Sequence, residues 1–241
     1  MVTHVSPSAP SSDNAIAYPE SDGQPMADNT VQFRWITVIH YNLAWLFADD
    51  PNVFVAGDLL WYPVEGNNRL RCAPDVMVVF GVPKGDRGSY LQWQENNIAP
   101  QVVFEILSPG NSFKEMSRKL VFYERYGVEE YYQYDPQDNS LLGWVRSNTL
   151  LNPIAETNGW VSPRLQIRFE VTDETLVLYR PDGQPFSDYL EVQRRLEAAE
   201  SRATAAEGAL QQERERSQRL EQLLRDSGID PAQIDNPDSN P

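Results

Sequence analysis

The chain has 241 residues, of which 41% are hydrophobic and 11% aromatic, so it can bury one sizeable core but is short for two full domains. Its formal charge is −15, with net charges of −4 over residues 1–30, −5 over residues 31–180 and −6 over residues 181–241. This spread of acidity excludes a broad basic surface for tight, non-specific duplex binding, so any nucleic-acid role requires a local basic groove or divalent ions.

The sequence also indicates in which cellular compartment the protein is expected. Cys72 is the one cysteine, so no intramolecular disulfide can form, which suits a reducing cytoplasm. The N-terminus lacks the basic and apolar regions of a signal peptide, and no apolar run approaches the roughly 20 residues that span a bilayer. We therefore expect a soluble cytoplasmic protein without membrane contact.

The first predicted elements are a disordered segment and a helix. Residues 1–30 are rich in Ser, Pro, Asp and Asn, a composition typical of disorder. Residues 31–48 repeat apolar side chains at helical spacing until Asp49, Asp50 and Pro51 end the run. This helix opens a domain that we place at residues 31–185.

Strand-like runs follow, each bounded by Gly, Pro or Asn. They cover residues 53–56, a weaker run at 59–62, residues 75–80 and residues 101–107. Residues 82–100, between the last two runs, read as an excursion without a regular pattern.

The second half of the domain begins with a helix over residues 113–126, for which Gly127 is the expected C-cap. A short aromatic strand at 130–134 ends at Asp135 and Pro136. Further strands, expected to be antiparallel, cover residues 141–146, 165–171 and 175–179. The order of helix, strands, helix and strands predicts a mixed α/β core rather than a regular alternation.

The pattern changes at residues 186–228, which we predict to be a helical tail. Mostly apolar residues recur there at alternating steps of three and four, the spacing of a coiled coil, although the seam is rich in Ala and is interrupted at Glu213 and Ser217. A single charged helix is the alternative. Residues 229–241 form a polar, disordered end.

Glu105 is the first residue in an unusual chemical setting. Strand side chains alternate faces, and both faces of residues 101–107 are otherwise apolar, as in a strand covered on each side. A bare carboxylate there would cost several kcal/mol to desolvate, so Glu105 must be paired, protonated or bound to a cation.

Asp75 opens another strand, directly after Pro74. If the two strands are neighbours, Asp75 and Glu105 converge at one sheet end, where a divalent cation would relieve their repulsion. Oxygen ligands of this kind suit Mg²⁺ or Mn²⁺, and the carbonyl of Ile106 is a candidate third ligand. Asp58, after another strand-like run, is a further candidate, although its place after Gly57 favours a turn.

Lys119 lies at the border of the inward face of the helix 113–126, three residues after Met116. Its long stem can follow the apolar surface and bring the ammonium to a site at the rim. There it could orient a water nucleophile or stabilise charge on a phosphate oxygen.

Each of these residues also has a purely structural interpretation. A Pro-Asp pair before a strand can be turn chemistry, and Glu105 could pair with a buried Arg. Lys119 follows Glu115 by four residues, and an exposed pair of that kind contributes roughly 0.3–0.5 kcal/mol. The combination of three such residues favours a site.

Several short motifs accompany these residues through the middle of the chain. They are Pro74-Asp75-Val76, Phe104-Glu105-Ile106-Leu107-Ser108-Pro109, Lys119, Tyr123, Gly127-Val128, Glu130-Tyr131-Tyr132 and Asp135-Pro136. Together they resemble the Uma-two family, restriction-endonuclease-like proteins expanded in cyanobacteria. The resemblance covers roughly residues 31–180, and the helical tail is also similar to that of the family.

The resemblance implies a PD-(D/E)XK core, in which a central mixed sheet is flanked by helices. Asp75 matches the first acid of that pattern and Glu105 the second. The lysine of the commonest pattern stands two residues after the second acid, where this chain has Leu107. The resemblance implies that Lys119, from the following helix, takes its place.

Two functions follow as hypotheses. The first is a Mg²⁺- or Mn²⁺-dependent endonuclease that hydrolyses DNA, with Asp75, Glu105 and Ile106 as metal ligands and Asp75, Glu105 and Lys119 as catalytic residues. The second is a catalytically inactive module of the same fold, used for binding or assembly. In both cases we expect a homo-oligomer, a dimer, formed through the domain and the C-terminal helix.

Overall fold

The computed structural model describes residues 16–228 and divides into two units, one ending at Ser187 and the other beginning at Asp188. The predicted disorder at residues 1–15 and 229–241 lies outside the described residues. The second unit consists of one long helix, α3 (Tyr189–Asp226), whose N-cap Asp188 accepts from the Glu191 amide.

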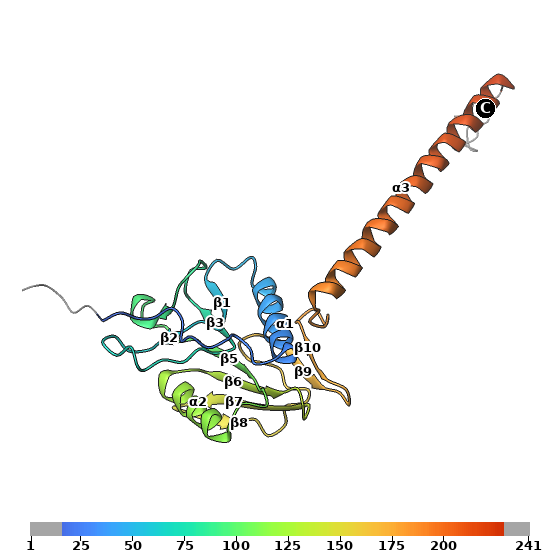
Figure 1. Ribbon diagram of the computed structural model, residues 1–241. Helices are drawn as coiled ribbons and strands as arrows, with labels where there is room; N and C mark the ends of the chain where they lie inside the picture. The colour runs from blue at the N-terminus through green and yellow to red at the C-terminus, as the bar shows by residue number, and fades with distance from the viewer. Residues whose placement is uncertain (1–15, 229–241) are drawn as a thin grey trace, which may run out of the picture. The chain divides into compact units, whose positions relative to one another are not determined.

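The first unit is built on a six-stranded sheet (Figure 1). In spatial order its strands are β1 (Val53–Gly57), β3 (Val76–Phe80), β5 (Val102–Ile106), β6 (Glu130–Asp135), β7 (Ser140–Ser147) and β8 (Leu150–Pro153). Neighbours are antiparallel except β5 and β6, which are parallel and are joined by the helix α2 (Phe113–Tyr126). A parallel pair needs a crossover connection, and α2 supplies it.

Two small sheets complete the unit. Strands β9 (Arg168–Val171) and β10 (Leu176–Tyr179) form the expected antiparallel pair. Strand β2 (Trp61–Tyr62) pairs in parallel with β4 (Tyr90–Leu91), which is followed by the short helix η1 (Gln92–Gln94). The predicted excursion at 82–100 therefore contains β4 and η1, and the sequence pattern also missed β8.

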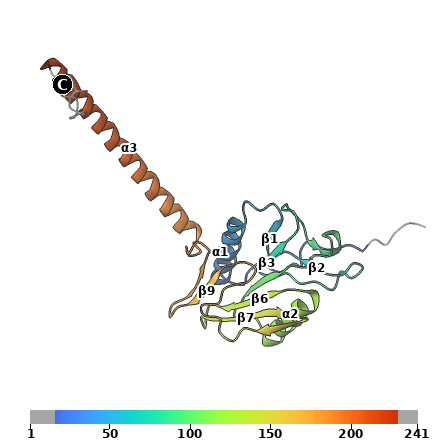
Figure 2. The same ribbon diagram turned by 180° about the vertical axis from the view of Figure 1, so that it is seen from behind.

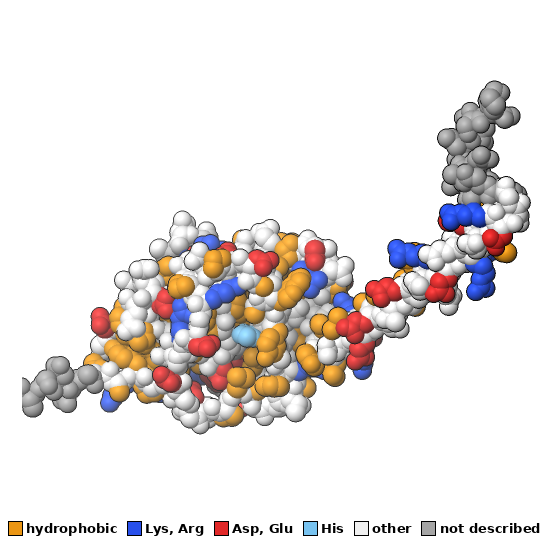
Figure 3. Space-filling view, turned by 90° about the horizontal axis from the view of Figure 1, so that it is seen from above, with side chains coloured by type: hydrophobic (Ala, Val, Ile, Leu, Met, Phe, Trp, Pro, Cys, Tyr) orange, Lys and Arg blue, Asp and Glu red, His pale blue; other side chains and the backbone are white. Residues whose placement is uncertain are grey.

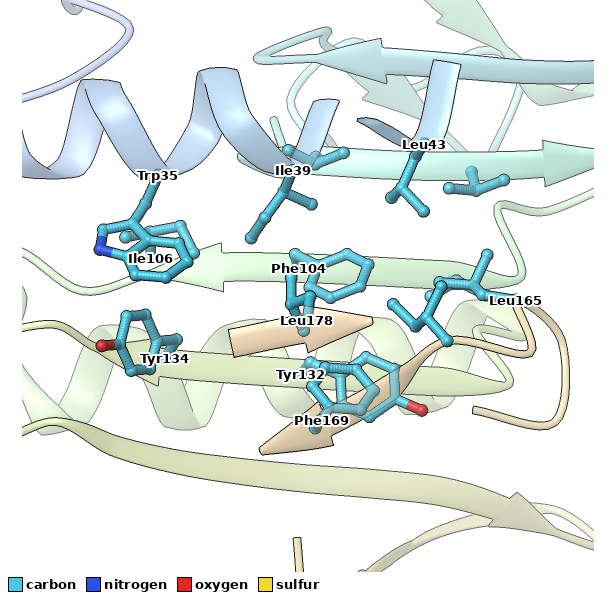
Figure 4. Close-up of a cluster of buried hydrophobic side chains, with 14 of the residues drawn as sticks. Trp35, Ile39, Leu43, Phe104, Ile106, Tyr132, Tyr134, Leu165, Phe169 and Leu178 are labelled. Carbon is cyan, nitrogen blue, oxygen red and sulfur yellow. The ribbon is translucent and has the colours of Figure 1, made fainter. Parts of the chain in front are cut away.

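The helix α1 (Thr30–Leu46) covers one face of the sheet, and α2 covers the other (Figures 1 and 2). Trp35, Ile39 and Leu43 on α1 point toward the sheet, with Ile39 near Phe104 and Trp35 near Ile106 of β5, and the β9–β10 pair packs into the same cluster (Figure 4). On the other face, Tyr123 of α2 packs with strand residues such as Val103. Strand β5 is thus covered on both faces, as its sequence predicts.

Residues 16–29 also lie against this unit, which differs from the disorder that their composition predicts. The Tyr62 hydroxyl donates to the Pro19 carbonyl at 2.7 Å, and the Gly66 amide donates to the Tyr18 hydroxyl at 2.6 Å. The rings of Tyr18 and Tyr62 meet edge to face, with centroids 5.2 Å apart. One aromatic anchor therefore places a segment that is otherwise polar.

The predicted fold class is confirmed, since the unit is a mixed α/β structure with a central mixed sheet between helices and is followed by a helical tail. Within residues 16–228, no helix is both long enough and apolar enough to cross a membrane.

Candidate active site

The pairing of β3 with β5 brings two of the predicted site residues together. Val76 is paired with Phe104 in antiparallel register, so Asp75 and Glu105 stand at the next position outward. Residues opposite one another on antiparallel strands point to the same face, with Cβ atoms about 4.5–5.5 Å apart. The Ile106 amide also donates to Asp75 Oδ2 at 2.6 Å. The two acids therefore meet at one end of the sheet.

The third predicted residue reaches this point from α2. Lys119 Nζ lies 2.7 Å from Glu105 Oε2, and the exposed fractions of the two side chains are 20% and 2%. Glu115, the alternative surface partner of Lys119, is instead contacted by the Asn111 side chain at 3.4 Å. The helix α2 thus brings the Lys119 ammonium into contact with the buried Glu105 carboxylate, near Asp75.

Tyr123 is a site residue that the sequence interpretation matched to a family motif but assigned no role. Its fully buried hydroxyl donates to Glu105 Oε1 and lies 3.2 Å from Cys72 Sγ. Tyr123 is four residues after Lys119, so both lie on one helical face, and this spacing could have identified it. Burial raises the pKa of Tyr123 well above its usual value, so the phenol stays protonated and acts as a donor.

The pKa values of two site residues, Asp75 and Lys119, lie above their usual values. Burial, followed by the charge of Glu105, raises the pKa of Asp75 well above its usual value, while Lys119 opposes the rise. For Lys119, burial lowers the pKa, but the charge of Glu105 outweighs it and the net pKa lies above the usual value. Lys119 is therefore charged and pairs with Glu105, whereas burial beside that acid favours the protonated form of Asp75.

These side chains line a cavity of about 400 Å³ whose rim is also acidic. Asp22, Asp28, Asp58 and Glu115 line it together with the site residues, so the N-terminal segment forms part of its wall. Asp58 has the left-handed φ of 47°, and its amide donates to the Pro74 carbonyl at 3.1 Å. Burial and then the charge of Asp22 raise the pKa of Asp58. Asp58 thus combines the expected turn conformation with a place in the cavity wall.

Gln32 of α1 is a polar residue of the site that the sequence interpretation missed. Its Nε2 donates to the Ile106 carbonyl at 2.9 Å, and its Oε1 accepts from the Asp28 amide at 2.8 Å. Gln32 precedes the apolar stripe of α1, three residues before Trp35. A polar residue on a buried stripe is the signal that could have found it.

The donor atoms fit a hard divalent cation. Two carboxylates and the Ile106 carbonyl, which keeps a second lone pair beside its bond to Gln32, are oxygen ligands that suit Mg²⁺ or Mn²⁺. Cys72 is a poor ligand, because burial raises the pKa of its thiol to about 12. Within residues 16–228, no group of three or more His, Cys, Asp or Glu side chains is arranged to hold a metal. Water or substrate oxygens would have to complete the shell, as they commonly do for Mg²⁺.

Comparison with known proteins identifies a matching family and similar solved structures. Residues 13–176 match the family Uma2, described as "Putative restriction endonuclease". The crystal structure of a protein from Anabaena variabilis, described as a putative nuclease belonging to DUF820, is similar with a TM-score of 0.42 and 14% identity. The similarity covers 56% of this chain and 72% of that one. No curated protein matches the chain.

Proposed function

This chain belongs to the Uma2 family of restriction-endonuclease-like proteins, and from that premise we propose that it is a divalent-metal-dependent nuclease that hydrolyses DNA phosphodiester bonds. The observation that carries the proposal is the meeting of Lys119 with Glu105 at 2.7 Å, beside Asp75 and on a cavity. A buried acid pair with one rim lysine supplies metal ligands and a cation for a phosphate oxygen.

Each residue of the site has a separate task. Asp75, Glu105 and the Ile106 carbonyl would hold Mg²⁺ or Mn²⁺, which when bound polarises a phosphate oxygen and lowers the pKa of water. The Ile106 amide orients Asp75, and the Tyr123 hydroxyl orients Glu105. Lys119 stays protonated, so it stabilises negative charge on the phosphate rather than removing a proton from water.

A local basic face on α2 supports DNA as the substrate of this acidic chain. Lys114, Arg118 and Arg125 are all exposed and recur at helical spacing on the helix that carries Lys119. Phe113, 90% exposed at the start of the helix, adds an aromatic surface on which a base could stack. The face is small, so binding should depend strongly on salt and on divalent ions.

Cleavage assays on the purified full chain test the proposal. With Mg²⁺ or Mn²⁺ and single-stranded, duplex or branched DNA, we expect cleavage that Asp75→Asn or Lys119→Met reduces by on the order of a thousandfold. Asp173→Asn, an exposed acid in the turn before β10, is the matched control and should keep full activity. Failure to cleave any of the three substrate types, or cleavage unaffected by Asp75→Asn, would contradict the proposal.

The second candidate is an inactive binding or assembly module. One observation favours it: both oxygens of Glu105 are engaged, by Lys119 and Tyr123, so the acid has internal partners without a metal. Metal titration separates the two candidates. A nuclease should gain about 2–3 kcal/mol of unfolding free energy at Mn²⁺ concentrations near 100 times its Kd, and Asp75→Asn should abolish the gain. A thermal unfolding midpoint that Mg²⁺ and Mn²⁺ leave unchanged would favour the inactive module.

A further inference from the structure

The helix α3 exposes a long apolar seam to solvent. Its 38 residues include none that is buried in the structure. The apolar side chains of its heptad seam stay about half exposed, for example Leu196 at 51%, Leu210 at 53% and Leu220 at 52%. A helix of this kind gains most of its stability from packing rather than from intrinsic helix propensity. We therefore expect the apolar seam to pack against another helix.

The charged residues that flank the seam indicate how a second helix would pair with it. If Tyr189 is heptad position a and Val192 is position d, positions e and g flank the seam. The e positions are mostly acidic: Gln193, Glu200, Glu207, Arg214 and Glu221. The g positions carry no acid: Arg195, Arg202, Ala209, Arg216 and Leu223. Figure 3 shows charges of both signs along this helix. One flank is therefore acidic and the other basic.

This segregation distinguishes the two possible orientations. In a parallel coil, each g residue faces the e residue five positions later on the other helix. With a second copy as partner, Arg195 meets Glu200, Arg202 meets Glu207, and Arg216 meets Glu221, each pair occurring twice. In an antiparallel coil, g faces g and e faces e, so Arg would meet Arg and Glu would meet Glu. We propose that α3 forms a parallel, in-register, two-stranded coiled coil with α3 of a second copy of this chain.

The residues of the seam show where this coil is weakest. Glu213 occupies a d position, so the two Glu213 side chains of the dimer would face each other. Arg216, 4.0 Å from Glu213 on the same helix, partly offsets this repulsion. Ser217 at the next a position is also polar. The exposed pairs within one helix, such as Arg225 with Glu221 at 3.7 Å, contribute little and can exchange for pairs between helices. The proposed dimer is therefore specific in orientation but moderate in affinity.

The orientation has a consequence for the compact units. Each α3 begins directly after a compact unit, so a parallel coil holds both units at the same end. This consequence rests on the proposed function: two tethered sites could act on the two strands of one duplex. The coil itself stands independently of catalysis, and its tests require no nuclease activity.

A charge-exchanged chain tests the orientation. It combines Arg195→Glu, Arg202→Glu and Arg216→Glu with Glu200→Arg, Glu207→Arg and Glu221→Arg, which leaves the net charge unchanged. In a parallel coil this chain pairs with itself, as the wild type does, but the mixed dimer brings like charges together. Its dissociation constant should be on the order of 100-fold higher than that of either homodimer. Mixed dimers that form as readily as the homodimers would overturn the parallel orientation.

Cysteine cross-linking tests the register in the full chain. Ser217→Cys at position a should give an intermolecular disulfide under mild oxidation, because the two copies of residue 217 face each other only in a parallel, in-register coil. Gln218→Cys, one residue further and on the outer surface, is the matched control and should cross-link at least about tenfold more slowly. Equal rates for the two variants, or sedimentation of the wild type as a monomer or trimer, would overturn the proposal.

Discussion

Glu105 illustrates how one residue can require several partners. Its carboxylate lies on a strand that is covered on both faces, with only 2% of the side chain exposed. Lys119 and Tyr123 each hold one of its oxygens, so the cost of burial is offset by an ion pair and a charge-assisted hydrogen bond. Removing either partner would leave the charge partly uncompensated.

Tyr123→Phe should therefore lower the free energy of unfolding by about 1.5–3 kcal/mol, because a hydrogen bond to a buried charged group is lost. Chemical denaturation gives this value, with an unchanged dependence on denaturant. Tyr126→Phe, on a half-buried tyrosine of the same helix, is the control and should cost no more than about 0.5 kcal/mol. Equal losses in the two variants would show that the Glu105 contact contributes nothing.

Glu130 is a third buried acid, at the other end of the parallel pair and away from Asp75 and Glu105. It accepts hydrogen bonds from the hydroxyls of Tyr132 and Ser162 and from the Arg164 amide at 2.6 Å. Burial raises the pKa of Glu130 despite these donors. The folded protein therefore binds this proton more tightly than the unfolded chain does.

That difference predicts a pH dependence of stability. The contribution of Glu130 is fully present below its unfolded pKa and is lost as the pH rises through the higher folded pKa. Glu130→Gln cannot lose a proton, so its unfolding free energy should improve relative to that of the wild type as the pH rises above about 4, the usual range of a glutamate. Denaturation curves recorded as the pH rises measure the difference, and parallel pH profiles would refute the assignment.

At the scale of elements, α2 does the most to assemble the site. Ser112 caps its first turn by accepting from the Glu115 amide at 3.2 Å, and Gly127 ends it with φ 96° and ψ 13°. Between these ends, spacing by four places Lys119 and Tyr123 on the face toward Glu105. The helix is also the crossover between β5 and β6, so its position is set by the sheet that holds Glu105.

A pair of glycine substitutions tests the C-cap. Gly127→Ala should cost roughly 1–2 kcal/mol, because a Cβ disfavours the left-handed conformation even though its nearest neighbour, the Ala99 Cβ, would lie 3.6 Å away. Gly208→Ala, in open space within α3, should instead increase helicity and stabilise that helix by up to about 1 kcal/mol. Thermal unfolding and circular dichroism report the two effects, and a shift of the same sign in both would contradict this account.

At the scale of the whole molecule, the two units differ in how they are stabilised. The compact unit has hydrophobic clusters on both faces of its sheet, whereas α3 has no buried residue in the single chain. The stability of the compact unit should therefore be independent of the helix.

A chain ending at Asp188 should fold with a thermal midpoint within about 2 °C of that of the compact unit in the full chain. It should also sediment as a monomer where the full chain sediments as a dimer. A truncated chain that remains dimeric would place the interface on the compact unit instead of α3.

Local patterns were sufficient to predict most elements and to single out the residues of the candidate site. Helical periodicity predicted α1, α2 and α3. Short apolar runs bounded by turn residues predicted β3 and β5, and a short aromatic run predicted β6. The lone Glu105 in an apolar strand marked the site because a buried charge must have a partner. Patterns missed β4 and β8, which are short, and the placement of residues 16–29, which depends on distant partners such as Tyr62.

Only the tertiary structure decided which strands are neighbours. The register of β3 on β5 placed Asp75 opposite Glu105, and the crossover through α2 brought Lys119 and Tyr123 to them. Gln32 and Asp58 joined the cavity from two further elements. The periodicity of the sequence indicates the face on which a side chain lies. Strand pairing depends instead on how segments that are distant in sequence pack together in the folded core.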